Sequence, residues 1–379
     1  MLNMLRETGD FYRVTSYGRL PLQATVIPPV TLPRNQAWYF GKDTTSGHIK
    51  EVDGLGIEMT HAKEAARKLG YDWQDYHCTI VRSNGGARSP TSYGGGGNVW
   101  MRSDSVSTCS HEIGHAFGLA HANFWQTNGA SVIGPGGNVE YGDIYDNMGS
   151  TSPPNGHWNV QAKNQIKWLP DEFVPPVTRS GTYRVYAFDT PRLEPGKLYG
   201  LRIPKDANRT YWAEHRTLFT ANNWASNGLL LGWKWPANAG GNLQLLDTTP
   251  GSPNDRTDAA ITVGRTFSDR EAGLHLTTLA VNTDTVPRSL EVRVNLGSFP
   301  GNQPPVAALS APTVVPTNLP VTFNVTASDP DGDELSYGWI WPDSTISPNA
   351  PSVTRTFANS GIYTLNCVVS DMKGGQTFC

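Results

Sequence analysis

One stretch of the sequence, SHEIGHAFGLAHA at Ser110–Ala122, constrains the fold more than any other. His111 and His115 are four residues apart, so on a helix their side chains project within about 40° of each other and can reach one ion. Gly118 is expected to end that helix in a left-handed conformation, which costs glycine little. The chain can then turn and bring His121 back towards the first two rings. The stretch therefore predicts a helix, a sharp turn and a three-histidine metal site.

Three nitrogen ligands are typical of a catalytic zinc site, because they leave the fourth position of a tetrahedral ion for water. Zinc lowers the pKa of such a water towards about 7. Glu112 follows the first histidine, where its carboxylate can take the proton from the water and pass it to a leaving amine. The alternative is an amphipathic helix with ordinary surface or core histidines, but the added glycine and third histidine make the pattern demanding. The sequence predicts a zinc-activated water with Glu112 as general base.

The rest of this helix is expected to be buried on the side opposite the histidines. Cys109, Ile113 and Phe117 cluster there, so the helix can pack on a core while its ligand face opens to a cleft. One of three polar residues is expected to cap the start of the helix: Ser103, Asp104 or Ser105.

HEIGHAFGLAH resembles the extended zinc motif of the metzincin peptidases, HExxHxxGxxH. The segment EYGDIYDNMG at Glu140–Gly149 is similar to the methionine turn of the gametolysin-like branch. FYRVTSYGRL and LLDTTPGS also resemble gametolysin-like and immune-inhibitor-A-like peptidases. The resemblance covers roughly residues 10–297 and is strongest at 105–150. It implies a metzincin fold, with Met148 as an apolar floor beneath the histidines rather than a ligand; the alternative is an ordinary core methionine.

Residues around the methionine turn carry further expectations from this resemblance. Some metzincins have a tyrosine ligand two residues after the methionine, and Ser150 stands there in this chain. Tyr141 or Tyr145 can instead stabilise an oxyanion. Asp143 and Asp146 are expected to hold the turn through hydrogen bonds to the backbone.

An edge strand is expected at Ser89–Tyr93, before a run of glycines. In metzincins such a strand pairs with extended substrate, which suits an endopeptidase because backbone pairing does not depend on side chains. The alternative is a plain surface loop. His157, close to the site in the sequence, is expected at the surface or at the start of a helix.

The patterns along the chain predict three domains. Residues 1–175 read as an α+β, metzincin-like zinc peptidase domain with a twisted mixed sheet, residues 176–298 as a β-sandwich and residues 304–379 as a small β-sandwich. In the first domain, alternation predicts strands and 3–4 spacing predicts helices. The strands are expected at 11–32, 76–82 and 98–102, and the helices at 56–70 and 157–169.

Residues 304–379 resemble a polycystic-kidney-disease-type (PKD) module through PPVAAL, DPDGDELSYGW and GIYTLNCVVSD. Such modules are spacers or contact polysaccharides, proteins or cell surfaces. Asp329, Asp331 and Asp333 alternate as the ligands of a structural calcium ion can, although a polar turn is the favoured interpretation.

Composition limits the partners and the compartment. The chain has 30 basic and 33 acidic residues, a net charge of −3, which argues against nucleic acid held by bulk charge. No apolar run approaches the roughly 20 residues that span a bilayer. Met1–Asp10 lacks the apolar region of a signal peptide, so a leader and any pro-segment are expected upstream of this chain. The four cysteines allow two disulfides, with Cys367 paired locally to Cys379 and Cys78 left for Cys109, or four buried thiols.

Together these observations predict a secreted zinc endopeptidase that cuts extracellular proteins or glycoproteins. A catalytically inactive metalloprotease-fold protein that acts in binding or adhesion is the main alternative, because nearly 200 residues of β modules follow the motif. A zinc hydrolase of non-peptide bonds is a third interpretation.

Overall fold

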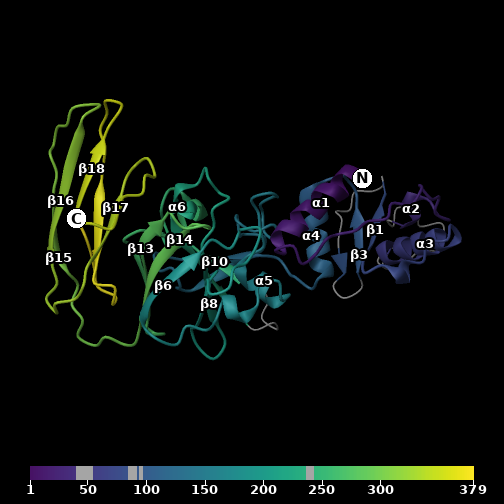
Figure 1. The fold of residues 1–379 in the computed structure, drawn as a ribbon, viewed down its shortest axis with the longest axis horizontal. Coiled ribbons are helices and arrows are strands. Elements are labelled where there is room, and N and C mark those ends of the chain that lie inside the picture. Colours follow the sequence, from purple (N-terminus) through teal and green to yellow (C-terminus); the bar gives the residue numbers. More distant parts are fainter. Residues whose placement is uncertain (40–53, 84–91, 94–96, 236–242) are drawn as a thin grey trace. The chain divides into compact units, whose positions relative to one another are not determined.

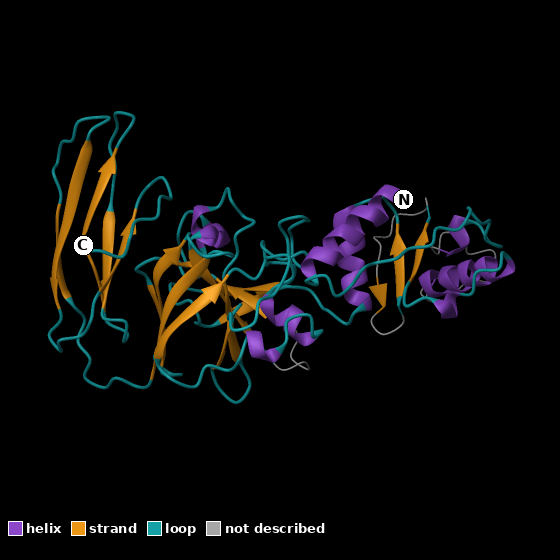
Figure 2. Cartoon of the chain, viewed as in Figure 1, coloured by secondary structure: helices purple, strands orange, loops and turns teal. Residues whose placement is uncertain are grey.

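The computed structural model describes residues 1–379 except 40–53, 84–91, 94–96 and 236–242, and the chain divides into two compact units (Figure 1). Helices provide most of the regular structure of the first unit and strands most of that of the second (Figure 2). The first unit comprises Met1–His121 and Tyr145–Trp158, and the second Ala122–Ile144 and Asn159–Cys379.

The first unit combines helices with a small mixed sheet of order β1-β3-β2. Strand β1 runs parallel to β3, and β2 runs antiparallel to it. The helices are α1 (Leu2–Thr15), α2 (Gln36–Tyr39), α3 (Gly54–Lys68) and α4 (Val106–Ala116), with a 3-10 turn at Trp73–Asp75. The strands are β1 (Thr79–Arg82), β2 (Ser92–Tyr93) and β3 (Asn98–Met101).

The N-terminal part of this unit corrects one expectation. Residues 11–32 were expected to form strands, but α1 covers Leu2–Thr15 and no regular element follows before Gln36. Met4, Leu5, Thr8, Phe11, Tyr12 and Thr15 are its buried residues. Their 3–4 spacing is that of a helix face, and it is visible only when the pattern is followed from residue 4. Alternation over the few residues from Phe11 onwards was therefore a misleading signal.

Helix α3 confirms the helix expected at 56–70 and packs on the sheet. Leu55 and Met59 are buried against Trp100 of β3, and the Trp100 indole donates a hydrogen bond to the Leu55 carbonyl at 2.9 Å. Arg102, after β3, pairs with the buried Glu58 of α3 at 3.0 Å. These contacts join the helix to the strand that leads into α4.

The second unit begins with two stacked sheets. The larger sheet has the order β5-β4-β10-β9-β8-β7, with β11 added on β9, and the smaller has the order β12-β13-β14-β6. The strands of the larger sheet are β4 (Asn123–Thr127), β5 (Gly136–Val139), β7 (Leu201–Pro204), β8 (Thr210–Glu214), β9 (Gly228–Lys234), β10 (Leu243–Leu246) and β11 (Ile261–Thr262). Those of the smaller sheet are β6 (Gly181–Tyr186), β12 (Thr266–Asp269), β13 (Leu274–Asn282) and β14 (Ser289–Leu296).

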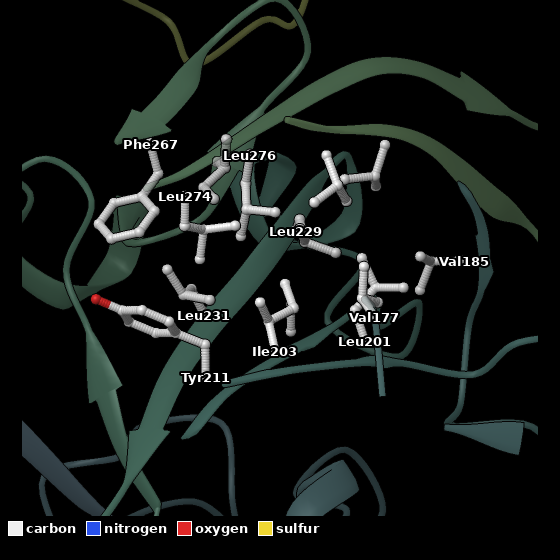
Figure 3. Close-up of a cluster of buried hydrophobic side chains, with 14 of the residues drawn as sticks. Val177, Val185, Leu201, Ile203, Tyr211, Leu229, Leu231, Phe267, Leu274 and Leu276 are labelled. Atoms are coloured by element: carbon white, nitrogen blue, oxygen red, sulfur yellow. The ribbon is translucent and has the colours of Figure 1, made fainter. Parts of the chain in front are cut away.

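The apolar core of this part draws residues from both sheets (Figure 3). Leu229 and Leu231 of β9 and Leu274 and Leu276 of β13 are all buried in one cluster. Short β-like runs separated by turns had indicated a β-sandwich here, and the two-layer arrangement follows because the sheets bury apolar residues against each other.

Among the described residues of this unit, the short helices α5 (Val160–Gln165) and α6 (Asn223–Ser226) accompany the sheets, with 3-10 turns at Asp171–Phe173 and Asp255–Asp258. Helix α5 is shorter than the helix expected at 157–169. Asn159 caps its start by accepting a hydrogen bond from the Ala162 amide, and Lys167 adopts a left-handed φ of 63°. The left-handed residue ends the helix before Pro170 does.

The C-terminal part of the second unit is a small sandwich of two three-stranded sheets, β15-β16-β18 and β17-β19-β20. Its core includes Phe323, Trp339, Trp341 and Cys367. The strands are β15 (Val306–Ser310), β16 (Pro320–Ser328), β17 (Ser336–Ile340), β18 (Ser352–Thr356), β19 (Asn366–Ser370) and β20 (Gln376–Phe378). The fold is therefore multidomain and rich in β-structure, as the sequence predicted.

Candidate metal centre

Helix α4 carries the first two histidines, and local sequence explains both of its ends. Ser105 is the cap among the three expected candidates, since its hydroxyl accepts a hydrogen bond from the Thr108 amide at 3.2 Å. At the other end Gly118 has a φ of +82°, and the Leu119 amide donates to the Gly114 carbonyl at 3.1 Å. The expected left-handed glycine is confirmed, and the chain turns sharply after it.

The turn brings three imidazoles together. One ligand nitrogen from each of His111, His115 and His121 lies within 4.8 Å of the others. The Nε2 atoms of His115 and His121 are 3.1 Å apart. Among the described residues this is the one group of three or more histidine, cysteine or carboxylate side chains close enough to share an ion.

Backbone carbonyls orient two of the rings. The Nδ1 atom of His111 lies 2.8 Å from the Asn147 carbonyl, and that of His115 lies 2.7 Å from the Leu119 carbonyl. A carbonyl can only accept, so each Nδ1 carries the proton and each Nε2 keeps its lone pair. Such a partner fixes both the tautomer and the direction of a ligating ring.

Burial also keeps the histidines in the form that binds metal. Desolvation is the main cause that lowers the pKa of His111 to about 4, and the neighbouring imidazoles lower it further. The pKa of His115 is lowered for the same reasons. These two rings are therefore neutral near pH 7, and only a neutral imidazole has a free lone pair for a metal ion.

Met148 packs against α4 at Gly114, which lies between the first two histidines on the helix. A Cβ atom on Gly114 would lie 2.6 Å from the Met148 Sδ and 3.0 Å from a ring carbon of Trp158. Any larger residue at this position would force Met148 or Trp158 to shift. Asp146 holds the methionine turn as expected, because its carboxylate accepts a hydrogen bond from the Met148 amide at 2.7 Å.

Glu112 lies beside the histidines on α4 and is only 6% exposed. Its position in the helix, one residue after the first histidine, sets its carboxylate next to the ligand face. A carboxylate in such a shielded place can exchange a proton with a group held at the histidines.

Helix α1 supports α4, the helix that carries the first two histidines, and the sequence analysis did not predict this contact. The buried Tyr12 hydroxyl donates a hydrogen bond to the Ser110 carbonyl at 2.8 Å. Its ring packs edge-on against Trp158, with centroids 5.3 Å apart. The signal that could have found this contact was the helical spacing from residue 4, which the strand interpretation concealed.

The remaining candidates near the site differ in location. Tyr145 is buried within the first unit, whereas Tyr141 belongs to the second unit and is 43% exposed. His157 is buried and packs edge-on against Phe11, so the expectation of a surface position is wrong. Of the expected edge strand, Ser92–Tyr93 forms β2, and residues 89–91 lie outside the described residues.

The aspartates considered for calcium hold a turn in the C-terminal module. The Asp329 carboxylate accepts hydrogen bonds from the Asp331 amide at 2.9 Å and the Asp333 amide at 3.1 Å. Asp333 pairs with Lys373. These contacts are those of a polar turn, and a calcium ion stays a prediction.

Comparison with known proteins adds one family to these observations. A family model described as a PKD domain matches residues 302–378, in agreement with the resemblance seen in the sequence. No curated protein and no solved structure matches the chain. Within the described residues, no helix combines the length and apolarity needed to cross a membrane. The chain is therefore similar to PKD-containing proteins over its C-terminal module.

Proposed function

We propose that this chain is a secreted, zinc-dependent endopeptidase that hydrolyses peptide bonds of extracellular proteins or glycoproteins. The observation that carries the proposal is the convergence of His111, His115 and His121 within 4.8 Å, with Glu112 beside the first of them. The resemblance of HEIGHAFGLAH to the metzincin motif supplies the peptidase class.

The residues present fit a zinc ion. Zinc accepts imidazole nitrogen readily, and three such ligands are typical of its catalytic sites. The carbonyls of Asn147 and Leu119 occupy Nδ1 of the two α4 histidines, which leaves Nε2 of each ring available as a ligand. When bound, zinc supplies Lewis acidity, which polarises a carbonyl and acidifies water.

The chain's own residues then divide the work of hydrolysis. Glu112 takes a proton from the attacking water and gives it to the nitrogen of the departing amine. Its low exposure shields this transfer from bulk solvent. Met148 and Trp158 pack closely against α4 at Gly114, between the first two histidines, and so support the helix that carries them. Strand β2 lies at an edge of its sheet, where an extended peptide can pair.

The test replaces Glu112 by glutamine, which keeps the size of the side chain and removes the base. Glu112→Gln should retain stoichiometric zinc and lose at least about a thousandfold in casein cleavage, since general base catalysis and its proton return are both removed. Glu64→Gln, an exposed position on α3, is the matched control and should cleave like the parent. Undiminished cleavage by Glu112→Gln would reject the proposal.

The PKD match favours a second candidate, a catalytically inactive metalloprotease-fold protein that binds or adheres to surfaces. The intact glutamate and the three histidines argue against it. The two candidates differ in a simple assay. If the chain cleaves casein or a matrix glycoprotein, and this cleavage stops with a chelator and returns with zinc, the peptidase is supported. If the chain holds stoichiometric zinc but cleaves no member of a peptide library, the binding protein is supported.

A further inference from the structure

The last two strands of the chain place two cysteines opposite each other. Strands β19 and β20 are antiparallel, with Val368 facing Phe378. In the next pair, the Cys367 amide donates to the Cys379 carbonyl at 2.8 Å and the Cys379 amide to the Cys367 carbonyl at 2.9 Å. Residues that exchange both hydrogen bonds have Cα atoms about 5.5 Å apart and side chains on the same face of the sheet.

The turn between these strands fixes their register. The Asp371 carboxylate accepts hydrogen bonds from the Lys373 amide at 2.7 Å and the Gly375 amide at 2.9 Å. Met372 and Gly374 adopt left-handed φ values of 60° and 113°. A shift by one residue would break this turn and would also rotate the buried side chains out of the core.

Both sulfur atoms face the core of the module. Trp339 of β17 lies opposite Cys367, so Trp339, Cys367 and Cys379 form one row across three strands. Cys367 is fully buried, and Cys379 packs against the same core while keeping some exposure. In the structure all four cysteines of the chain are thiols.

We propose that Cys367 and Cys379 are a disulfide site that fastens β20 to β19. Disulfides span Cα separations of about 4.4–6.8 Å, and the hydrogen-bonded pair falls within that range. Because the backbone already holds the two residues opposite each other, closing the bond needs side-chain rotation rather than movement of the strands.

A low-molecular-weight disulfide such as oxidised glutathione is the oxidant. The thiolate of the more exposed Cys379 attacks one sulfur of the glutathione disulfide, breaks that bond and releases one glutathione thiolate. The Cys367 thiol then loses its proton and attacks the mixed disulfide, which releases the second glutathione. One S–S bond is broken and one is formed, and the two cysteine protons end on the two glutathione thiols.

The disulfide would stabilise the short edge strand β20 of the module. Strand β20 is three residues long and lies at the edge of its sheet, where strands separate most easily. Closing a short loop removes unfolded conformations and shifts the folding equilibrium by on the order of a hundredfold. The reduced protein should therefore open this strand more often than the oxidised protein.

The experiment maps the thiols of the full chain. The protein is equilibrated with reduced and oxidised glutathione, denatured, alkylated, digested and analysed by mass spectrometry without reduction. A peptide pair joined through Cys367 and Cys379 is expected, and Cys379→Ser should leave Cys367 alkylated. Alkylation of both residues, or a bond from either to Cys78 or Cys109, would overturn the proposal.

Two further measurements keep the result independent of the other cysteines. The double variant Cys78→Ala, Cys109→Ala should still give the peptide pair joined through Cys367 and Cys379. If this variant does not fold, the cysteine assignment of the parent protein alone tests the proposal. Hydrogen exchange of the β20 amides should accelerate when the parent is reduced and should not respond to reductant in Cys379→Ser. If the exchange rate of the β20 amides in the parent does not change on reduction, a disulfide does not fasten β20 to β19.

Discussion

The two compact units rely on different kinds of contact. In the first, two histidine rings are directed by the carbonyls of Asn147 and Leu119, and α4 is supported by Tyr12 and Met148. In the second, sheets face each other across a broad apolar cluster. The geometry of the candidate metal centre depends on a few directional contacts, whereas the stability of the sandwich is distributed over many similar ones. A change of one side chain should therefore affect metal binding sharply in the first unit and folding alone in the second.

The largest effect is expected from removal of a ligand. His115→Ala leaves two histidines at the site, so zinc occupancy after dialysis should fall below about a tenth and proteolysis should become undetectable. Metal analysis of the purified variant measures the first and casein cleavage the second. His77→Ala changes a histidine outside the cluster and serves as the matched control, with full zinc content expected. Retained stoichiometric zinc in His115→Ala would mean that the ion binds elsewhere.

A core truncation in the second unit should change stability without touching the metal. Leu231 is buried in the sandwich core, so Leu231→Ala should lower the free energy of unfolding by about 2–5 kcal/mol. Denaturant titration gives the stability, and zinc analysis of the folded fraction should give the parent's value. Leu319→Ala, at a site 55% exposed, should stay within about 0.5 kcal/mol. Loss of zinc from folded Leu231→Ala would contradict the claim that core changes in the second unit affect folding alone.

Overpacking against α4 is expected to have a smaller effect on stability but a measurable effect on zinc affinity. The Cβ of Gly114→Ala would press on Met148 and Trp158, which should cost about 1–3 kcal/mol and displace the first two histidines. Zinc affinity, measured by competition with a chelator, should weaken. Gly129→Ala has open space around the new methyl group and should behave like the parent. Equal affinities in the two variants would show that Met148 does not set the ligand spacing.

The smallest effect is expected from one hydroxyl. Tyr12→Phe removes the hydrogen bond to the Ser110 carbonyl and should lower the free energy of unfolding by about 0.5–1.5 kcal/mol. Thermal unfolding of the zinc-loaded protein measures this loss. Tyr183→Phe removes a bond of the same type that is exposed to solvent in the second unit, so its effect should be smaller. The reverse order would contradict a supporting role for α1.

Local patterns in the sequence accounted for the elements whose determinants are local. The cap at Ser105 and the left-handed Gly118 bound α4, and both are encoded within a few residues of the helix. Strand β14 shows the alternation of a strand with one face against the core, with Leu290, Val292 and Val294 buried. Strand β9 is buried along almost its whole length, and its short apolar run between turns was the signal that indicated it. Helix α1 was missed because the pattern was followed from Phe11 rather than from Met4.

The contacts that no local pattern predicted join distant segments. The Asn147 carbonyl orients His111 across 36 positions of sequence, and its direction depends on how the methionine turn folds. Strand β4 pairs in parallel with β10, with Asn123 facing Gln244. Register between such distant strands is set by the packed sheet as a whole, so hydropathy alone could not give it.

The most direct test of the account is X-ray absorption at the zinc edge, performed on the full chain after dialysis with chelator and reloading with one equivalent of zinc. The account predicts one zinc per chain with three imidazole nitrogens at about 2.0–2.1 Å, and the loss of one nitrogen in His121→Ala. A chain that takes up no stoichiometric zinc, or whose zinc spectrum is unchanged in His121→Ala, would contradict it.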